Sequence, residues 1–537
     1  MLANYKRKNF LPFIAFGLLL LAPLVNFLQF NNYNFAAPES IIIIVVLLAT
    51  AGFLSVIYRV AGWGGRVILI SGLITLTFSF FPGWHSLLAL LLTFLMALLL
   101  GMLFSRKLLE LIVIFAAVFI LAILLFPSPR PISVPQLTQR SEQAINTKLP
   151  PIIYLVLDEH AGLAALPTLT PQEQQVKTRL QNFYQQSGFF VYASAYSHYP
   201  ATANSLPNLF NYSTSNQDDY YFPKTNDRVL VKNDFFRLLT QKGYQIRVYQ
   251  PDFIDYCQAQ GAAISSCYTY PSLSMRNIEK VKLSFADRWL LLSKGFLLQS
   301  ALFQLVMHEY QDWLQPWLVK DGYQPPPWNW YQARISSLTM PSIFARVQHD
   351  VSMQPQGTVF FAHVLAPHNP FAYDANCRLL PASQWQIARG PAPFVNSLAT
   401  KQARYALYEG QLVCVQKQLQ MFFSQLQRAG IYQHAIIIVH GDHGSRIALH
   451  SLTPENKAQL TQQDFRDYYQ TLFAVKLPGQ GTGYDQQLRS LQQILAQVTQ
   501  TITGQAVQVA SDVPFVYLYP DKSHGIMLRM NKSAFRS

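Results

Sequence analysis

The chain has 537 residues, which is enough for roughly two or three domains. Half of its residues are hydrophobic and only 13% are charged, against about 25% in ordinary soluble proteins, which argues against a wholly soluble chain. The net charge of +14 fits anionic lipid better than nucleic acid, for which the sequence has no binding motif, although a solvated basic surface without a specific partner is the simpler explanation.

The apolar residues gather in the first quarter of the chain, in five runs that are candidate membrane-spanning helices. Each run has roughly the 17–20 apolar residues needed to cross a bilayer, the third being slightly short. The runs lie at about 10–28, 40–58, 67–82, 87–104 and 108–126. We therefore expect a transmembrane anchor of five helices in residues 1–127.

Basic residues favour one orientation of this anchor. Lysine and arginine precede the first run and lie between the second and third and between the fourth and fifth, whereas residues 29–39 and 83–86 contain neither. The positive-inside rule therefore places the N-terminus in the cytoplasm and everything after residue 127 outside it. If the first run were instead a signal peptide cleaved near Ala36 and Ala37, the C-terminal part would still lie outside.

All four cysteines lie in this external part of the chain. An even number of cysteines in an oxidising compartment indicates disulfides, and we predict the pairs Cys257–Cys267 and Cys377–Cys414. Four free thiols are the alternative.

Residues 128–150 are proline-rich and polar, which is typical of a linker. From residue 151 the hydrophobic pattern alternates between strands and helices, as in an α/β sandwich with a largely parallel central sheet. The strand at 152–157 is almost entirely apolar, which indicates a central position covered on both faces. The other expected strands are 189–196, 244–250, 358–365 and 434–440, and the expected helices begin at Pro171, cover 233–243 and cover 401–428.

An insertion at about 268–345 breaks this alternation. Its segment 289–307 is apolar but is interrupted by polar residues, which makes it a poor spanning segment and a fair interfacial helix. We hypothesise that it rests on the outer leaflet and admits lipid head groups, while an ordinary helical subdomain fits the pattern equally well. The insertion contains Trp289, Trp313, Trp317, Trp328 and Trp330.

Three short motifs carry the residues of a candidate site, namely IIYLVLDEH (152–160), HYPATANSLPNLF (198–210) and IIIVHGDHG (436–444). The first and third are expected to be buried strands that end in metal-ligand side chains. Because ligands of parallel sheets bind beyond the carboxyl ends of the strands, these side chains should meet there. Seen alone, each motif is as easily a helix cap or a tight turn with incidental polar groups.

The second motif offers the hydroxyl of Thr202 as a candidate nucleophile. A threonine hydroxyl is too weak for this role unless a cation lowers its pKa, as Zn²⁺ lowers the pKa of bound water to about 7. One or two zinc ions are therefore expected, with Mn²⁺ and Ca²⁺ as alternatives, and Glu159 is left open as a further ligand. The predicted ligands are Asp158, Thr202, Asp442 and His443.

In this order and behind a membrane anchor, the motifs resemble those of the alkaline phosphatase and sulfatase superfamily. The segment TANSLPNLF (202–210) is similar to the nucleophile segment of membrane-bound lipid A phosphoethanolamine transferases, and the architecture also resembles that of lipoteichoic acid synthases. The resemblance implies that Thr202 is the nucleophile, that Ser205 contacts the substrate and that residues 151–537 form an external sulfatase-like catalytic domain.

Two segments are closer to sulfatases than to the transferases. The first is Asp158-Glu159, where the transferases have one glutamate, and the second is Ala-Pro-His-Asn-Pro at 366–370. The sequence lacks the Cys/Ser-x-Pro-x-Arg segment from which sulfatases make formylglycine, which disfavours a true sulfatase.

Three histidines complete the predicted site. The resemblance implies that His368 contacts the transferred group or protonates the leaving oxygen, since a histidine can do either near neutral pH. His363 and His450 are predicted to contact the substrate, and any of the three could instead bind a second metal. Taken singly, each is more often a surface or core histidine.

The sequence therefore predicts a metal-dependent phosphotransferase that moves a phospholipid head group, of phosphoethanolamine or phosphoglycerol type, to a cell-surface glycolipid or glycan through a phospho-threonine intermediate. The alternatives are a membrane-anchored phosphoric or sulfuric ester hydrolase with the same residues, and a non-catalytic envelope binding protein. We expect a multi-pass protein of a bacterial-type plasma (inner) membrane, with its catalytic domain periplasmic or extracellular and no nucleic-acid partner.

Overall fold

The computed structural model describes residues 2–81, 86–104, 107–125, 135–140, 146–215, 228–314, 335–385, 396–509, 514–518 and 526–530. The chain divides into two compact units. The helical unit consists of Met1–Val134, Leu273–Arg334 and Pro381–Ser383. The sheet unit consists of Pro135–Ser272, Ile335–Leu380 and Gln384–Ser537.

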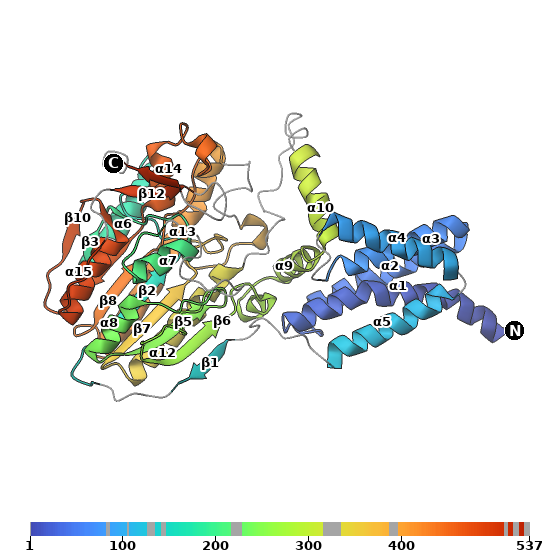
Figure 1. The fold of residues 1–537 in the computed structure, drawn as a ribbon, viewed down its shortest axis with the longest axis horizontal. Helices are drawn as coiled ribbons and strands as arrows, with labels where there is room; N and C mark the ends of the chain where they lie inside the picture. The colour runs from blue at the N-terminus through green and yellow to red at the C-terminus, as the bar shows by residue number, and fades with distance from the viewer. Residues whose placement is uncertain are drawn as a thin grey trace. The chain divides into compact units, whose positions relative to one another are not determined.

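The helical unit begins with five apolar helices, as predicted (Figure 1). Four of them contain stretches long enough to cross a membrane, and α3, with 16 residues, is a shorter apolar helix. Residues 1, 82–85, 105, 106, 126 and 127 of the predicted anchor lie outside the described residues. Long apolar helices satisfy their own backbone groups, which is the requirement for a membrane anchor. The helices are α1 (Leu2–Phe30), α2 (Pro38–Val60), α3 (Trp63–Phe78), α4 (Leu87–Phe104) and α5 (Leu108–Leu125).

The insertion adds further helices to this unit. The interfacial helix predicted at 289–307 is in fact two helices, α9 (Phe285–Leu297) and α10 (Ala301–Glu309), which are bent by 97°. The bend occurs where Ser300 caps α10, its Oγ accepting a hydrogen bond from the backbone N–H of Phe303 at 3.2 Å. The unit also contains the turns η1 (Met275–Lys280) and η2 (Tyr310–Leu314), while Trp317, Trp328 and Trp330 lie outside the described residues.

The sheet unit is built on a nine-stranded sheet, in the order β1-β6-β5-β7-β2-β8-β9-β3-β10. The five strands from β6 to β8 in this order run parallel, which confirms the predicted largely parallel sheet. β1 and β9 are antiparallel to their neighbours. The strands are β1 (Gln136–Gln139), β2 (Ile152–Leu157), β3 (Phe190–Tyr192), β5 (Gln245–Pro251), β6 (Ile264–Tyr270), β7 (Thr358–Val364), β8 (Ile436–His440), β9 (Phe473–Lys476) and β10 (Gly483–Asp485).

β1 lies within the segment predicted as a linker. It pairs with β6 at the edge of the sheet, so part of residues 128–150 belongs to the sheet unit, while residues 126–134 and 141–145 lie outside the described residues. Two smaller sheets pair β4 (Ala195–Tyr196) with β11 (Arg489–Ser490) and β12 (Phe515–Leu518) with β13 (Ile526–Arg529).

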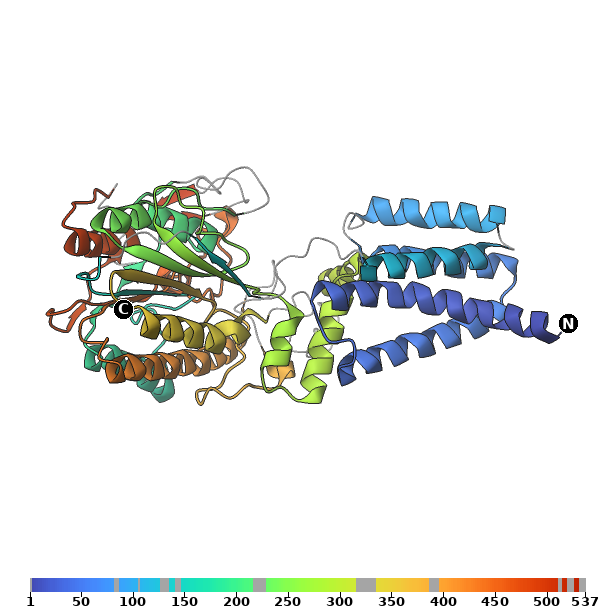
Figure 2. The ribbon, with the colours of Figure 1, turned by 90° about the horizontal axis from the view of Figure 1, so that it is seen from below.

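Helices cover both faces of the large sheet, which explains why β2 is buried along its whole length (Figure 2). One face carries α7 (Thr202–Phe210), α8 (Asp234–Lys242) and α15 (Leu491–Thr503). The other carries α6 (Pro171–Gln186), α12 (Met340–Met353) and α13 (Leu398–Arg428). The remaining elements are α14 (Gln462–Tyr469) and the short turns η3 (Ser336–Thr339), η4 (Ala382–Gln384) and η5 (Pro454–Asn456).

The structure contains the predicted capping box and both predicted disulfides. α6 starts with the expected capping box, in which Thr170 Oγ1 accepts from the N–H of Glu173 at 3.2 Å and the Glu173 carboxylate accepts from the N–H of Thr170 at 2.8 Å. Both predicted disulfides, Cys257–Cys267 and Cys377–Cys414, are present.

Candidate metal centre

The site lies where three neighbouring parallel strands end. β2 pairs with β7 on one side and with β8 on the other, so their carboxyl ends share one edge of the sheet. Asp158 follows β2 directly, and Asp442 and His443 follow β8 after one glycine. Gly441 has no room for a side chain, because an added Cβ would lie 2.5 Å from the carbonyl oxygen of His160. A glycine is therefore required for this loop to pack closely against the chain after β2.

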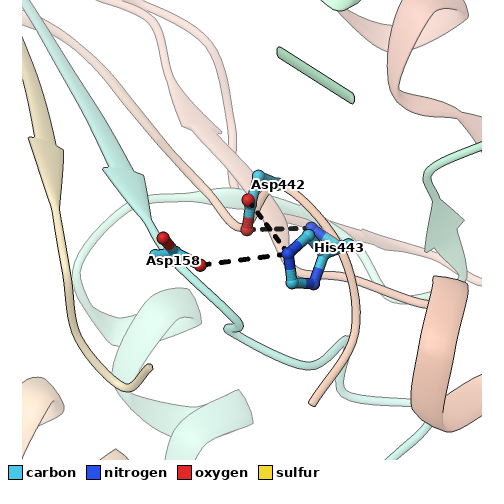
Figure 3. Close-up of side chains that lie close together, drawn as sticks. All are labelled: Asp158, Asp442 and His443. Carbon is cyan, nitrogen blue, oxygen red and sulfur yellow. Dashed lines mark hydrogen bonds and ion pairs between the residues drawn. The ribbon is translucent and has the colours of Figure 1, made fainter. Parts of the chain in front are cut away.

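Three of the predicted ligands converge at this edge. One potential ligand atom from each of Asp158, Asp442 and His443 lies within 4.8 Å of the others, and all three residues are buried (Figure 3). The Nε2 atom of His443 is 3.3 Å from Asp442 Oδ2 and 4.0 Å from Asp158 Oδ1. The sequence therefore predicted correctly that these three side chains meet.

These residues fit a metal ion. Among the described residues, neither Asp158 Oδ1 nor His443 Nε2 has a hydrogen-bond partner, although buried polar atoms almost always have one. Burial and the neighbouring Asp442 raise the pKa of Asp158, because two carboxylates face each other away from water. A cation would satisfy the unpaired atoms and relieve this repulsion, and oxygen and nitrogen ligands together suit Zn²⁺.

Thr202 lies directly beside this group. It is the first residue of α7, and its Oγ1 donates a hydrogen bond to Asp442 Oδ2 at 2.6 Å. The same carboxylate accepts from the backbone N–H groups of Glu159 and His443 through Oδ1, at 3.1 and 3.0 Å. Although burial would raise the pKa of Asp442, His443 and these hydrogen bonds hold it below its ordinary value. Asp442 is therefore an ionised acceptor held against the threonine hydroxyl.

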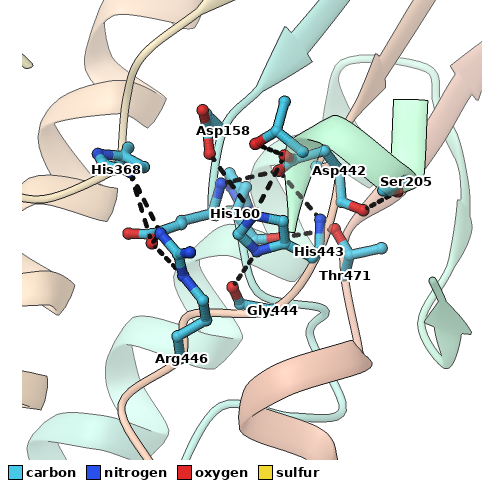
Figure 4. A network of polar contacts seen from close by, with 12 residues as sticks. Asp158, His160, Ser205, His368, Asp442, His443, Gly444, Arg446 and Thr471 are labelled. Atoms are coloured by element: carbon cyan, nitrogen blue, oxygen red, sulfur yellow. Dashed lines mark hydrogen bonds and ion pairs between the residues drawn. The ribbon is translucent and has the colours of Figure 1, made fainter. Parts of the chain in front are cut away.

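Ser205, predicted to contact the substrate, makes hydrogen bonds within the protein. The residue is 1% exposed, and its hydroxyl donates to the backbone carbonyl of Asp442 at 2.6 Å and lies 2.9 Å from Ser197 Oγ. This hydroxyl is engaged within the protein, where it fixes the Asp442 loop against α7 (Figure 4).

The carboxylate of Glu159 does not belong to the cluster of Asp158, Asp442 and His443. Glu159 has a left-handed backbone conformation, with φ of 63°, which breaks the alternation of the strand. Its carboxylate binds the guanidinium of Arg446, with Arg446 Nε 2.6 Å from Oε1, and accepts from the N–H of Asn369 at 3.1 Å. Burial alone would raise the pKa of Glu159, but the Arg446 guanidinium and two nearby histidines outweigh it and hold that pKa at about 2.

His368 belongs to this ion-pair network. Its Nε2 is 3.3 Å from Arg446 Nη2 and 3.7 Å from Glu159 Oε1, and its Nδ1 is 2.5 Å from the carbonyl oxygen of Asn369 (Figure 4). Its side chain is 15% exposed, so this imidazole is accessible from outside the protein.

The other two predicted histidines lie in different surroundings. His363, on β7, has its Nε2 3.4 Å from Asp158 Oδ2 and its Nδ1 3.3 Å from the Tyr256 hydroxyl. Burial lowers the pKa of His363 to about 4, so its imidazole is neutral. His450 instead binds Asp464, with Nδ1 2.7 Å from Oδ2, at the start of α14.

Residues 151–500 match the family model for Sulfatase, which is more than half of the chain. The chain belongs to the sulfatase family. Membership supports transfer or hydrolysis of phosphoryl or sulfuryl groups at this site. Among curated proteins, none matches the chain.

Solved structures similar to this sulfatase-family chain are distant from it. The C-terminal periplasmic domain of EcEptC from Escherichia coli, in complex with Zn, is 11% identical over 73% of this chain and 95% of its own, with a TM-score of 0.40. The phosphonate monoester hydrolase of Agrobacterium radiobacter is 12% identical over 69% and 80%, with a TM-score of 0.40. A protein in the alkaline phosphatase superfamily from Vibrio parahaemolyticus is 10% identical over 73% and 78%, with a TM-score of 0.39.

Two residues of this sulfatase-family site were missed from the sequence. Arg446 follows the Gly-Asp-His-Gly motif by two positions, and Asn369 follows His368. Each contacts the carboxylate of Glu159, which is far away in the chain. One signal in the sequence could have identified Arg446. An arginine next to a metal-ligand motif is expected to lie in a buried site, where its positive charge needs an anionic partner.

Proposed function

We propose that this chain is a metal-dependent phosphotransferase that moves a phospholipid head group to a cell-surface glycolipid or glycan. The head group is of phosphoethanolamine or phosphoglycerol type, and Thr202 carries it as a phospho-threonine between the two half-reactions. The observation that supports this proposal most directly is the 2.6 Å hydrogen bond from Thr202 Oγ1 to Asp442 Oδ2, beside Asp158 and His443.

In the first half-reaction, Thr202 Oγ1 forms a bond to the phosphorus, and the bond from phosphorus to the oxygen of diacylglycerol breaks. The proton of Thr202 leaves toward Asp442 Oδ2, which already accepts it in a hydrogen bond. A zinc ion held by Asp158, Asp442 and His443 would lower the pKa of the Thr202 hydroxyl and offset the charge on the phosphoryl oxygens.

The protein also supplies charge and a proton on the side of the leaving group. Thr202 is at the N-terminus of α7, where the backbone N–H groups favour an anion. His368 is the candidate proton donor to the leaving oxygen, for which its Nε2 would have to be protonated and turned from Arg446 to that oxygen. In the second half-reaction, an acceptor hydroxyl attacks the phosphorus and gives its proton to His368, the bond to Thr202 Oγ1 breaks, and Thr202 regains its proton from Asp442.

A phospholipid donor is proposed because the described part of the chain includes four helices long enough to cross a membrane. A transfer reaction is preferred to sulfate-ester hydrolysis because a threonine occupies the nucleophile position and the formylglycine segment is lacking in the sequence. If water takes the place of the acceptor, the same residues make a phosphoric ester hydrolase.

The test is a peptide-resolved mass spectrum of full-length protein purified from its own membranes, with Thr202→Val as the matched control. We expect a phosphoethanolamine or phosphoglycerol adduct on Thr202, and loss of turnover on the order of 10³-fold or more in Thr202→Val. Diacylglycerol release from labelled phospholipid should need a glycolipid or glycan acceptor. Release without any acceptor would select the hydrolase, and a fully active Thr202→Val protein would refute the mechanism.

A further inference from the structure

The bent helix pair α9–α10 belongs to the helical unit but is not one of its five N-terminal helices. Together the two helices are long and apolar enough to pass for a membrane span, yet they meet at 97°. The pair lies between strands of one sheet: β2 precedes it in the chain, whereas β7 and β8, the neighbours of β2, follow it. A full crossing would put β2 on the opposite side of the membrane from its neighbours. The chain must therefore enter and leave the insertion on one side.

The pair is fastened to one end of the helix bundle. Phe296 of α9 stacks on Phe80, after α3, with ring centroids 4.7 Å apart, and Ser300 Oγ lies 2.7 Å from Ser79 Oγ. Arg288 forms an ion pair with Glu39, in the first turn of α2, at 3.4 Å. The end of α3 and the start of α2 adjoin the loops that lack lysine and arginine, which the positive-inside rule places outside the cytoplasm.

The pair exposes apolar side chains next to polar ones, since Gln304, His308 and Glu309 of α10 are exposed as well. α10, which the structure describes throughout, has the sequence ALFQLVMHE, and Ala301 is its only buried residue. Val306 is 57% exposed and Trp313, after α10, is 81% exposed. On α9, Phe285 and Trp289 are exposed and lie four positions apart, on one face of the helix.

We propose that α9 and α10 form an interfacial element that rests on the outer leaflet, with membrane phospholipid covering these exposed apolar side chains. α10 runs across the long axes of α1–α5 rather than along them (Figure 1), so it lies along the leaflet instead of crossing it. Tryptophan side chains favour the depth of the lipid head groups, where their polar N–H stays hydrated. This assignment does not depend on the proposed chemistry of Thr202.

The test uses the full chain in vesicles of phosphatidylcholine, either plain or with bromine on the acyl carbons nearest the head group, which quenches tryptophan emission on contact. The variants are Trp313→Phe and Trp289→Phe. The matched control is Trp385→Phe, which removes a buried tryptophan of the sheet unit whose Nε1 donates to the carbonyl of Leu380 at 2.8 Å.

In plain lipid, each variant should have weaker emission than the unmodified protein. In brominated lipid, we expect the differences due to Trp313 and Trp289 to be lost, because these side chains are already quenched, and the difference due to Trp385 to persist. Differences for Trp313 and Trp289 that persist undiminished in brominated lipid would overturn the proposal. A second outcome would also overturn the proposal. If the emission of these two side chains changed with the density of protein in the vesicle, another protein molecule rather than lipid would cover them.

Discussion

The Nη2 atom of Arg446 lies 3.3 Å from the Nε2 atom of His368. The guanidinium thus joins an accessible imidazole to the buried carboxylate of Glu159. Because the arginine N–H donates to Nε2, the remaining proton of a neutral His368 belongs on Nδ1, which faces the carbonyl oxygen of Asn369 at 2.5 Å. Both ring nitrogens of His368 are thus engaged within the protein, so Nε2 must leave Arg446 before it can serve a substrate.

Removing one partner of the Glu159–Arg446 ion pair should lower the free energy of unfolding more than removing both partners does. Arg446→Met leaves the carboxylate of Glu159 buried without its cation, so the free energy of unfolding should fall by about 3–5 kcal/mol. The double variant Glu159→Gln/Arg446→Met removes both charges and should lose much less than the two single variants together. Chemical unfolding of the full-length protein in detergent measures all three. Strictly additive losses would contradict a buried, mutually compensating pair.

Metal binding should stabilise the fold through Asp158, Asp442 and His443. Zn²⁺ added to chelator-treated protein at a hundred times its Kd should raise the free energy of unfolding by about 2.7 kcal/mol. The increase should disappear in His443→Ala and persist in His450→Ala, whose imidazole binds Asp464 instead. Thermal unfolding with and without metal checks this, and an equal shift in both variants would show that the ion binds elsewhere.

His450 should matter for stability in a pH-dependent way. Burial alone would raise the pKa of Asp464, but hydrogen bonds from His450 and Thr461 hold it below its ordinary value. The folded carboxylate therefore binds a proton less readily than the unfolded one, so it stabilises the fold above a pH of about 4 and loses this effect as the pH falls further.

His450→Ala should accordingly cost about 1 kcal/mol near neutral pH and clearly less near a pH of about 3. Urea unfolding of the variant and of the unmodified protein at the two pH values measures the difference. A cost that is the same at both would mean that Asp464 is not the partner that matters.

The two disulfides should contribute unequally. Cys377–Cys414 closes a loop with a sequence separation of 37, and Cys257–Cys267 one of 10. In the chain-entropy description, replacing both cysteines by alanine should cost about 4 kcal/mol for the longer loop and about 3 kcal/mol for the shorter one. Parallel unfolding curves of the two variants give the order, and a larger loss from the shorter loop would contradict this account.

The central strands could be predicted because their apolar character does not depend on distant contacts. β2 has the bounds expected from the sequence, and β5, β7 and β8 differ from them by one or two residues. The edge strand β1, with the sequence QLTQ, is exposed along its length and becomes a strand by pairing with β6. No hydrophobic pattern marks such a strand, so the sequence suggested a linker.

The residues of the site also differ in how well the sequence predicted them. Asp158, Asp442 and His443 follow neighbouring strands, so topology alone brings them together. The partner of Glu159 could not be predicted, because it depends on the left-handed turn at Glu159 and on a loop far along the chain. The histidines show the same limit, since local sequence places His363 and His450 near the motifs but does not decide which carboxylate each one meets.

The pairing of β2 with β7 and β8 also sets the order in which the protein can fold. The strand that carries Asp158 is synthesised before the whole insertion, and both of its neighbours come after it. At ordinary rates of protein synthesis this interval is on the order of tens of seconds. For that time six apolar residues emerge without partners, while α9 and α10 are already available to the bundle. Until residue 440 has been synthesised, β2 therefore lacks both of its strand partners, and we expect a holding chaperone to protect it.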